Sequence, residues 1–454
     1  MLSKYLTYIF CIYPQRELSV KTSASEKGKI ILCSIKRVIN DHFPTLFDKF
    51  DILPDSRKKR EYSITEIIAG ALFMFLFKET SRNAYNNDRR EKKLRETVYK
   101  YFGIHLPQGD ASDEVLCRLP PEHLEELKAR LVSGLIEQKI LRKFRFLGKY
   151  YLVAVDGTGM AAFEHRHCEH CLTKTSKNGV VTYFHYVLEA KIVTSSGLCI
   201  SLASEFIENM PGRDYEKQDC EQKAFVRLAA KIKKYFPRLP ICILADGLYP
   251  NSTVFNLCRQ YGWMFIITLK DGCLKTFNQE VGLLSATAKK QPVYRADKST
   301  RTTLNYTFLN DIEYDHHTYS WVSCTQSVLY IKNNKQETTH FVYITNIRQS
   351  HDNVVTTADS GRLRWKIENE GFNTQKNLGY ELGHKFSRTS YTAMQNYYHL
   401  LQIAHMINQL AEKTGAFIEL LNEHSKQTIR SLWKDLIGFM KHCQPSDSTA
   451  FQTG

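Results

Sequence analysis

The chain is organised around one segment, Tyr150-Tyr151-Leu152-Val153-Ala154-Val155-Asp156-Gly157-Thr158-Gly159-Met160. Its apolar run ends abruptly in a carboxylate, which is followed by glycines. A short apolar run bounded by turn residues is typical of a buried central strand, so we expect Asp156 at the carboxyl end of that strand, at the mouth of a sheet. An acid in this position can hold a metal ion.

The same pattern returns in Pro240-Ile241-Cys242-Ile243-Leu244-Ala245-Asp246-Gly247, and Arg364-Trp365-Lys366-Ile367-Glu368 places a third acid in a helical pattern. Asp-Gly after a strand is also a common turn, so neither aspartate is diagnostic alone. Two aspartates at neighbouring strand ends with a glutamate on a later helix form a set of oxygen ligands that hard divalent cations prefer. The sequence therefore predicts an acidic triad of Asp156, Asp246 and Glu368.

Composition favours a globular protein with a polyanionic partner. The 454 residues are 43% hydrophobic, and 62 Lys and Arg against 47 Asp and Glu give a formal net charge of +15. The alternative is a merely basic soluble protein. The 12 cysteines are scattered through apolar patterns, which is typical of reduced intracellular packing. The apolar runs at 1–14 and 67–77 are too short to span a bilayer, so we expect a cytoplasmic protein without a membrane partner.

Residues 26–148 have a helical pattern, with Ser63-Ile64-Thr65-Glu66 as a capping box that opens one helix. The basic cluster Arg57-Lys58-Lys59-Arg60 suits contacts with DNA phosphates, because lysine and arginine release the counterions condensed on DNA. The alternative for this cluster is a solvated helix face. We expect a helical DNA-binding region here.

After Tyr150 the periodicity changes toward that of strands. Three strands are expected at 150–155, 183–193 and 198–206, followed by a helix at 218–236, the strand that ends at Asp246, a helix at 252–261 and a strand at 263–269. Three antiparallel strands followed by alternating helix and strand is the order of the ribonuclease-H-like fold. Residues 271–350 are rich in Thr, Tyr and Val and predict a β-rich insertion, and helices are expected at 361–375 and 392–412.

The fold class expected is therefore α/β, a ribonuclease-H-like mixed sheet with a β-rich insertion, preceded by a helical N-terminal domain. The expected organisation has six parts, which are a tail (1–25), the helical DNA-binding region (26–148), the first part of the core (149–270), the insertion (271–350), the C-terminal helices with the third acid (351–440) and a second tail (441–454).

The three acidic segments, taken in this order, resemble the catalytic blocks of the DDE transposases of bacterial insertion sequences. The branch that the chain resembles carries a β-rich insertion between the second aspartate and the glutamate. The resemblance implies that Asp156, Asp246 and Glu368 hold Mg²⁺ or Mn²⁺ and that Arg364 contacts a phosphate near the cleaved end. It also implies double-stranded DNA, both element ends and target, as the partner of a homodimer, and a nucleoid-associated protein of the cytoplasm.

The resemblance is incomplete around the glutamate. The family has a tyrosine three residues before the arginine and a lysine seven residues after the glutamate, where this chain has Gly361 and Gln375. Lys376 is the expected substitute for the lysine. Trp321, in the insertion, resembles the tryptophan that such enzymes use to hold a flipped base, and the alternative is a buried core tryptophan.

Two other features leave alternatives open. Cys168 and Cys171 have the spacing of a zinc knuckle, and a structural Zn²⁺ would need further ligands from the same loop or from a distant residue such as His185; the alternative is a reduced, metal-free loop. Glu370 competes with Glu368 as the third acid, but two residues along a helix is about 200° of rotation, so only one of them can face the sheet.

The function expected is that of a DNA transposase, which cleaves DNA at transposon ends with metal assistance and joins the freed strand to target DNA. One alternative is a catalytically inactive or domesticated DNA-binding protein. Another is a stand-alone metal-dependent nuclease of the same fold. The presence of all three acids favours an enzyme over the regulator.

Overall fold

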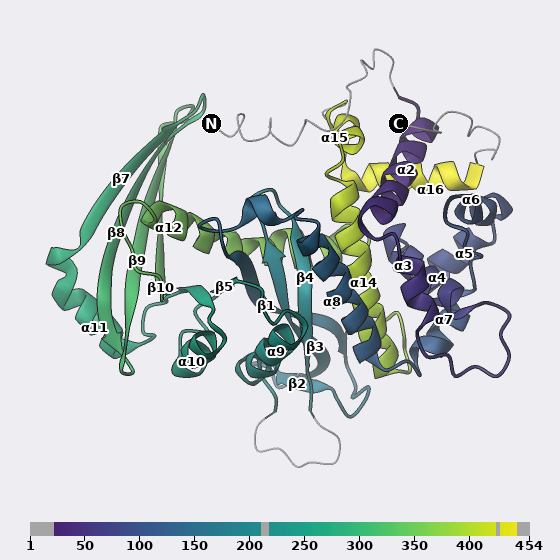
Figure 1. Cartoon of the computed structure of the whole chain (residues 1–454), viewed down its shortest axis with the longest axis horizontal. Coiled ribbons are helices and arrows are strands. Elements are labelled where there is room, and N and C mark those ends of the chain that lie inside the picture. Colours follow the sequence, from purple (N-terminus) through teal and green to yellow (C-terminus); the bar gives the residue numbers. More distant parts are fainter. Residues whose placement is uncertain (1–21, 210–217, 424–426, 443–454) are drawn as a thin grey trace.

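The computed structural model describes residues 22–209, 218–423 and 427–442. Most of the expected tails at 1–25 and 441–454 therefore lies outside the described residues. Residues 22 and 23 precede helix α2, which begins at Ala24, so residues 24 and 25 of the expected tail are helical. Residues 441 and 442 are the last two of helix α16. The architecture is mixed α/β, as expected, with helices at the N-terminal side of the chain and a mixed sheet beside them (Figure 1).

The N-terminal helices begin where the sequence signals place them. Ser23 and Glu26 form a capping box at α2, and Ser63 and Glu66 form the predicted one at α4. The apolar run at 67–77 lies almost wholly in α4, which is buried along most of its length. No helix of the described residues is both long and apolar enough to cross a membrane. The helices are α2 (Ala24–His42), α3 (Leu46–Asp51), α4 (Ile64–Leu76), α5 (Arg82–Arg89), α6 (Lys92–Phe102), α7 (Gly109–Leu116) and α8 (Pro121–Glu137), followed by a short 3₁₀ turn, η2 (Arg142–Phe144).

The first strands of the sheet are antiparallel and the next two are parallel to β1. The elements are β1 (Tyr151–Phe163), β2 (Leu172–Thr175), β3 (Val181–Val193), β4 (Cys199–Ile207), α9 (Glu221–Tyr235), β5 (Ile241–Ala245), α10 (Ser252–Tyr261) and β6 (Met264–Thr268). β3 pairs antiparallel with β1 and β4, whereas β5 pairs parallel with β1 and with β6. The expected succession of three antiparallel strands and then alternating helix and strand is present, with the short β2 added.

The expected end of the first strand was wrong. β1 runs on to Phe163, because its antiparallel pairing with β3 continues to Phe163 after its parallel pairing with β5 has stopped at Ala154. Asp156 therefore lies inside a strand, just beyond the part that β5 covers. The glycines after it, which the sequence pattern marked as turn residues, are accommodated in the strand itself.

The β-rich insertion extends the same sheet. It contains α11 (Lys275–Leu284), η3 (Ser285–Thr287), β7 (Lys289–Ala296), β8 (Thr300–Tyr314), β9 (His317–Tyr330) and β10 (Lys335–Thr345). β10 pairs antiparallel with β6, so the strand order runs β2-β3-β1-β5-β6-β10-β9-β8-β7, with β4 paired to β3. The long strands of the insertion form one end of the molecule in Figure 1.

The C-terminal helices connect the sheet to the N-terminal helices. A nearly continuous helical stretch comprises α12 (Val354–Arg362), the 3₁₀ turn η4 (Leu363–Trp365), the π-helix η5 (Ile367–Asn373) and α13 (Thr374–Asn377), and is followed by α14 (Tyr391–Ala411), α15 (Gly415–Asn422) and α16 (Ile429–His442). The helix expected at 392–412 is present as α14. Almost every residue of α14 is buried, because the helix runs between β4 and α8 on one side and α2 and α4 on the other (Figure 1).

Candidate active site

The structure brings two of the three predicted acids together through one arginine. Arg364 Nη1, in η4, lies 3.2 Å from Asp156 Oδ2 and 2.9 Å from Glu368 Oε1. The Arg364 side chain is only 8% exposed, while those of Asp156 and Glu368 are 22% and 39% exposed. The two carboxylates therefore share one buried cation and remain open to solvent, as a binding site for an ion or a phosphate requires.

Strand register places the third acid, Asp246, at the same edge of the sheet as Asp156. The parallel ladder between β1 and β5 ends at the pair Ala154 and Leu244. Asp156 and Asp246 each follow two residues after that pair, so both stand at the same edge of the sheet. The helical stretch η4–η5 packs on β1 and β5, which brings Glu368 to this edge. The three segments therefore approach one edge of the sheet, and Arg364 joins two of their acids, Asp156 and Glu368.

Asp246 stands somewhat apart from the other two acids. Its Oδ1 accepts a hydrogen bond of 2.9 Å from the Leu248 N–H, and its Oδ2 lies 3.1 Å from Lys270 Nζ. A Cβ atom at Gly247 would lie 2.5 Å from the Lys270 side chain, so glycine allows that lysine to reach the aspartate. In the described part of the chain, the ligand atoms of the three acids do not all lie within 4.8 Å of one another.

Burial perturbs the protonation of Asp156. The pKa of that carboxyl is raised to about 7, chiefly by burial and also by the neighbouring charge of Glu368, while Arg364 and the N–H of Gly157 act in the opposite direction. The Gly157 N–H donates to Asp156 Oδ1 at 2.9 Å. A carboxyl with this pKa is half protonated near neutrality, so a further cation at the site would favour its charged form.

Glu370, the competitor for the third position, points elsewhere. Its Oε1 accepts a hydrogen bond of 2.6 Å from Lys366 Nζ, and its side chain lies near Gly197 in the turn between β3 and β4. Glu368 is the acid that reaches Asp156 through Arg364. Only one of the two glutamates faces the pair of aspartates, as the rotation between them requires.

A fourth acid, Glu221, lies at the site and was not predicted from the sequence. It begins α9, and its two oxygens accept hydrogen bonds from Tyr186 at 3.1 Å and from Tyr249 at 2.9 Å. A Cβ atom at Gly157 would lie 2.7 Å from Glu221 Oε1, so this carboxylate abuts the residue after Asp156. The charges of Asp156 and Asp246 both help to raise the pKa of Tyr249, a shift caused mainly by burial. No spacing or dipeptide around Glu221 signals this role.

The two departures from the family signature have structural reasons. A Cβ atom at Gly361, in α12, would lie 2.7 Å from the ring of Tyr343, so this tyrosine of β10 occupies the space that a side chain at 361 would need. Gln375 is fully buried and hydrogen bonds with Gln402 and His405. Burial lowers the pKa of Lys376, and the nearby charge of Asp156 partly offsets this effect.

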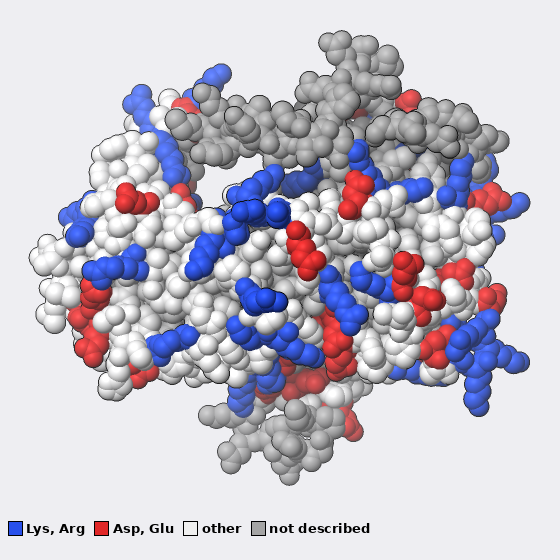
Figure 2. Space-filling view, in the orientation of Figure 1, with Lys and Arg blue, Asp and Glu red and all other residues white. Residues whose placement is uncertain are grey.

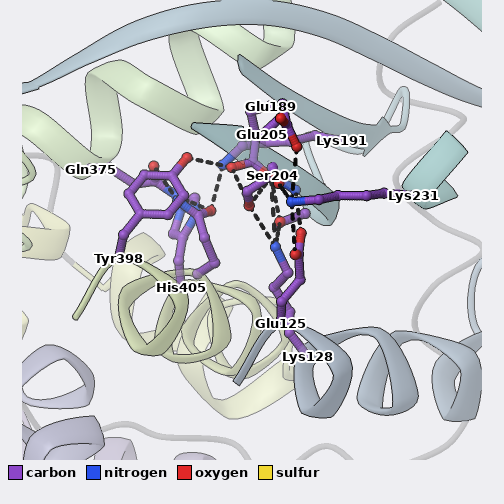
Figure 3. Close-up of polar contacts among 12 residues, drawn as sticks. Glu125, Lys128, Glu189, Lys191, Ser204, Glu205, Lys231, Gln375, Tyr398 and His405 are labelled. Atoms are coloured by element: carbon purple, nitrogen blue, oxygen red, sulfur yellow. Dashed lines mark hydrogen bonds and ion pairs between the residues drawn. The ribbon is translucent and has the colours of Figure 1, made fainter. Parts of the chain in front are cut away.

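Gln375 belongs to a buried polar network behind the site (Figure 3). Gln402 accepts hydrogen bonds from Lys191 at 2.6 Å and from Gln375 at 2.8 Å, which ties β3 to α14 and α13. Glu189, directly opposite Asp156 in the β1–β3 register, accepts from Tyr398 and from serine hydroxyls of β4. Because buried polar groups that lose a partner are unfavourable, this network holds the site strands and the helix after Glu368 in one arrangement.

The two tryptophans near the helical stretch differ in exposure. Trp321 lies in β9, opposite Ile344, and is partly buried against the main hydrophobic core. Trp365, which was not predicted as a site residue, is 52% exposed, and the Arg364 guanidinium lies 4.6 Å from the centroid of its ring. An exposed indole beside buried charged groups offers a surface on which a nucleic-acid base can stack.

The residues of the predicted basic cluster at 57–60 differ in exposure and in their contacts with acidic side chains. Arg57 is held by Asp55 at 2.9 Å and by the Tyr62 carbonyl, so it stabilises the loop between α3 and α4. Arg60 also contacts Asp55, at 3.2 Å, but its side chain is 58% exposed. Lys58 and Lys59 are exposed. These three, rather than Arg57, are the residues of the cluster available to a phosphate.

A second basic surface, the linker cations, lies just before β1. It consists of Lys139, Arg142, Lys143, Arg145 and Lys149, of which the first three line an open cleft together with Arg145. In the described residues no carboxylate forms an ion pair with any of them, and all but Arg145 are exposed. Figure 2 shows further lysine and arginine side chains across the centre of one face, with fewer acidic ones between them. A run of five cations without an acid was the sequence signal for this surface.

The predicted cysteine pair lies in the loop between β1 and β2. Cys168 and Cys171 have their sulfur atoms 3.8 Å apart, and His185 of β3 lies beside both. Among the described residues this is the one group of three or more His, Cys, Asp or Glu ligand atoms that all lie within 4.8 Å of one another.

Comparison with known proteins adds no relative. No family model matches the chain, and a search of curated proteins finds no match. The site itself is therefore the basis for assigning a function.

Proposed function

We propose that this protein is a DDE-type DNA transposase, which cleaves double-stranded DNA at element ends and joins the freed strand to target DNA. The observation that carries the proposal is the placement of Asp156 in β1, Asp246 just after β5 and Glu368 in a later helix at one edge of the sheet, with Arg364 between Asp156 and Glu368. Three oxygen-ligand side chains on rigid elements are what phosphodiester chemistry with divalent cations uses.

The topology supports a ribonuclease-H-like assignment for the core. Strands β1, β3 and β4 are antiparallel neighbours. The parallel strands β5 and β6 follow, with α9 before β5 and α10 between the two strands. The acids stand at the edge where the parallel pairing of β1 and β5 ends. The long β-rich insertion between Asp246 and Glu368 agrees with the branch that the sequence resembles.

The residues fit Mg²⁺ or Mn²⁺. Asp156, Asp246 and Glu368 supply hard oxygen donors, and Glu221 adds a fourth carboxylate beside Asp156. Burial keeps the pKa of Asp156 near 7, so a cation at this position would stabilise its charged form. When bound, such ions would activate a water or a 3′-hydroxyl and stabilise the leaving oxygen of the phosphodiester.

The chain's own groups would position the DNA. Arg364 is charged and nearly buried, so it holds Asp156 and Glu368 in place and presents its remaining donors to a phosphate. Lys376 adds a cation near Asp156, and Trp365 offers a stacking surface at the rim. The linker cations and Lys58, Lys59 and Arg60 would contact the DNA backbone further away. Joining two element ends requires two active sites, so the proposal includes a homodimer on DNA, within the nucleoid of the cytoplasm.

The test is cleavage and joining of DNA that carries the element ends, with Mg²⁺ or Mn²⁺ present. Asp156→Asn, Asp246→Asn and Glu368→Gln should each lower cleavage by about two to three orders of magnitude or more while DNA affinity changes little. Glu370→Gln is the matched control, because Glu370 pairs with Lys366 and lies away from the aspartates. Full activity in all three amide variants would refute the enzyme proposal.

The same assay separates the other functions. Cleavage without joining would identify a stand-alone nuclease. Salt-dependent DNA binding by the parent protein without any cleavage would identify a regulator that keeps the fold alone. Genomic sequence on either side of the coding region should show short inverted repeats if the element is a transposon, and these repeats supply the DNA for the assay.

A further inference from the structure

A second site lies further along the antiparallel ladder of β1 and β3, away from the acids. Along the ladder, Asp156 is opposite Glu189, whereas His185 is opposite Ala161. Five residues of a strand span about 16 Å, so the cluster of Cys168, Cys171 and His185 is separate from the acidic site. It takes no part in the proposed cleavage, and its chemistry must be explained independently.

The three ligand atoms form a nearly equilateral triangle. The two sulfur atoms are 3.8 Å apart, and His185 Nε2 lies 3.5 Å from Cys168 Sγ and 3.6 Å from Cys171 Sγ. A tetrahedral zinc ion, with Zn–S bonds of about 2.3 Å and a Zn–N bond of about 2.0–2.1 Å, requires S···S separations of about 3.8 Å and S···N separations of about 3.6 Å. The triangle thus has the dimensions of one face of a zinc tetrahedron. A disulfide would need sulfur atoms about 2.0 Å apart.

The loop is folded to present its cysteines. The Cys171 N–H bonds to the Cys168 carbonyl at 3.4 Å, which closes the turn, and Arg166 donates to the carbonyls of Cys168 and Glu169. Asn209 donates to the Cys171 carbonyl at 3.2 Å. Backbone groups of the loop are therefore satisfied by the protein, and the two thiols are left directed toward His185.

We propose that Cys168, Cys171 and His185 bind one Zn²⁺, with His167 as the fourth ligand. The His167 ring lies 6.4 Å from that of His185, whereas His170 is engaged by Glu208 at 3.3 Å and stacks on Tyr391. On binding, each cysteine loses its proton to solvent and coordinates as a thiolate. This is a structural metal centre, because its four ligands come from the protein and close the coordination shell.

The site fastens the loop to two other elements. His185 belongs to β3, and Tyr391, the first residue of α14, stacks on His185 at 4.5 Å and on His170 at 4.6 Å. Zinc would therefore join the loop after β1 to β3 and to the start of the central helix α14. Removing it should loosen this end of the sheet and leave the acids in place.

The experiment is metal analysis of the full chain, purified without added metal or chelator. The parent protein and Cys117→Ser, a cysteine of the N-terminal helices, should contain about one zinc per chain. Cys168→Ser, Cys171→Ser and His185→Ala should each retain less than a tenth of that amount. Cys168→His keeps a metal ligand at this position and should contain more zinc than Cys168→Ser. This difference would show that the serine variant loses zinc because a ligand is missing and not because the protein fails to fold.

Cobalt replacement provides a second readout that does not depend on the variants. The parent protein with Co²⁺ should show thiolate charge-transfer bands and the intense visible bands of tetrahedral cobalt. His167→Ala should lower zinc affinity at least tenfold; unchanged affinity would refute His167 as the fourth ligand. The site itself is refuted if the parent protein holds no zinc after reconstitution, or if its mass shows the loss of two hydrogens in a Cys168–Cys171 disulfide. Neither outcome touches the transposase proposal.

Discussion

Arg364 donates to Asp156 across 3.2 Å although 208 residues separate them in the sequence. The same guanidinium nitrogen donates to Glu368, one helical turn away. An arginine that pairs with two carboxylates in this way holds both side chains in a fixed arrangement. A cation that binds Asp156 and Glu368 must therefore either bind beside the Arg364 guanidinium or displace it from the two carboxylates.

Replacing Arg364 with Gln should destabilise the ion-free protein by about 1–3 kcal/mol, because two partly buried carboxylates lose their common partner. Mg²⁺ should then stabilise the variant more than it stabilises the parent, since the ion takes over the role of the guanidinium. Thermal unfolding with and without Mg²⁺ measures both effects. Arg362→Gln is the control, because Arg362 contacts Gln326 and the Phe341 ring. Equal Mg²⁺ responses of parent and Arg364→Gln would contradict this account.

Glu221→Gln should lower DNA cleavage by about 10- to 100-fold and raise the Mg²⁺ concentration needed for half-maximal activity. The carboxylate lies against Gly157 and is oriented by Tyr186 and Tyr249. A residue with a purely structural role would change the amount of active protein and leave the Mg²⁺ midpoint where it was. Titrating Mg²⁺ at fixed DNA concentration therefore tests the assignment directly.

The linker cations should determine part of the salt dependence of DNA binding. Replacing Lys139, Arg142 and Lys143 together with Gln should make the slope of log affinity against log salt shallower by up to about 2.7, that is, about 0.9 for each phosphate that the protein no longer neutralises. The matched control replaces Lys298 and Lys332, two exposed residues at turns of the insertion, and the exposed Lys335 at the start of β10, so that the net charge changes equally. Equal changes of slope in both variants would show that net charge, rather than this surface, governs binding.

Glu79 should make stability depend on pH. Its pKa is raised to about 8, chiefly by burial and also by the charge of Asp88, while the charge of Lys441 acts in the opposite direction. The folded protein therefore keeps the proton that the unfolded chain releases near its ordinary value of about 4.3. The contribution of Glu79 to the free energy of unfolding is fully present below that pH and is lost as pH rises toward about 8. Glu79→Gln should flatten this decline and be the more stable protein at pH 8–9, as measured by denaturant unfolding; a parallel decline in both proteins would contradict it.

The N-terminal helices cannot be tested apart from the rest of the chain. Their buried residues, such as Ile31, Leu72 and Leu131, belong to the same hydrophobic core as Leu400 of α14 and Leu436 of α16. A fragment of residues 26–148 would expose the faces that α14 and α16 cover. DNA-binding experiments therefore require the full chain.

The sequence by itself determined the local elements. Local sequence patterns predict the capping at Ser63, the limits of α10 and the apolar strand before Asp246, because each depends on residues within a few positions of one another. The order of strands and helices around the acids, and the β-rich character of the insertion, follow from the same local patterns.

Only the tertiary structure decided which side chains meet. Glu221, His185 and Arg364 acquire their partners through strand register and helix packing between segments that are far apart in sequence, and no local pattern encodes those distances. The extension of β1 past Asp156 depends on β3, and the complete burial of α14 depends on helices on both its sides. Pairing and burial are properties of the partner as much as of the segment, because a hydrogen bond or a packed face requires both sides to be in place.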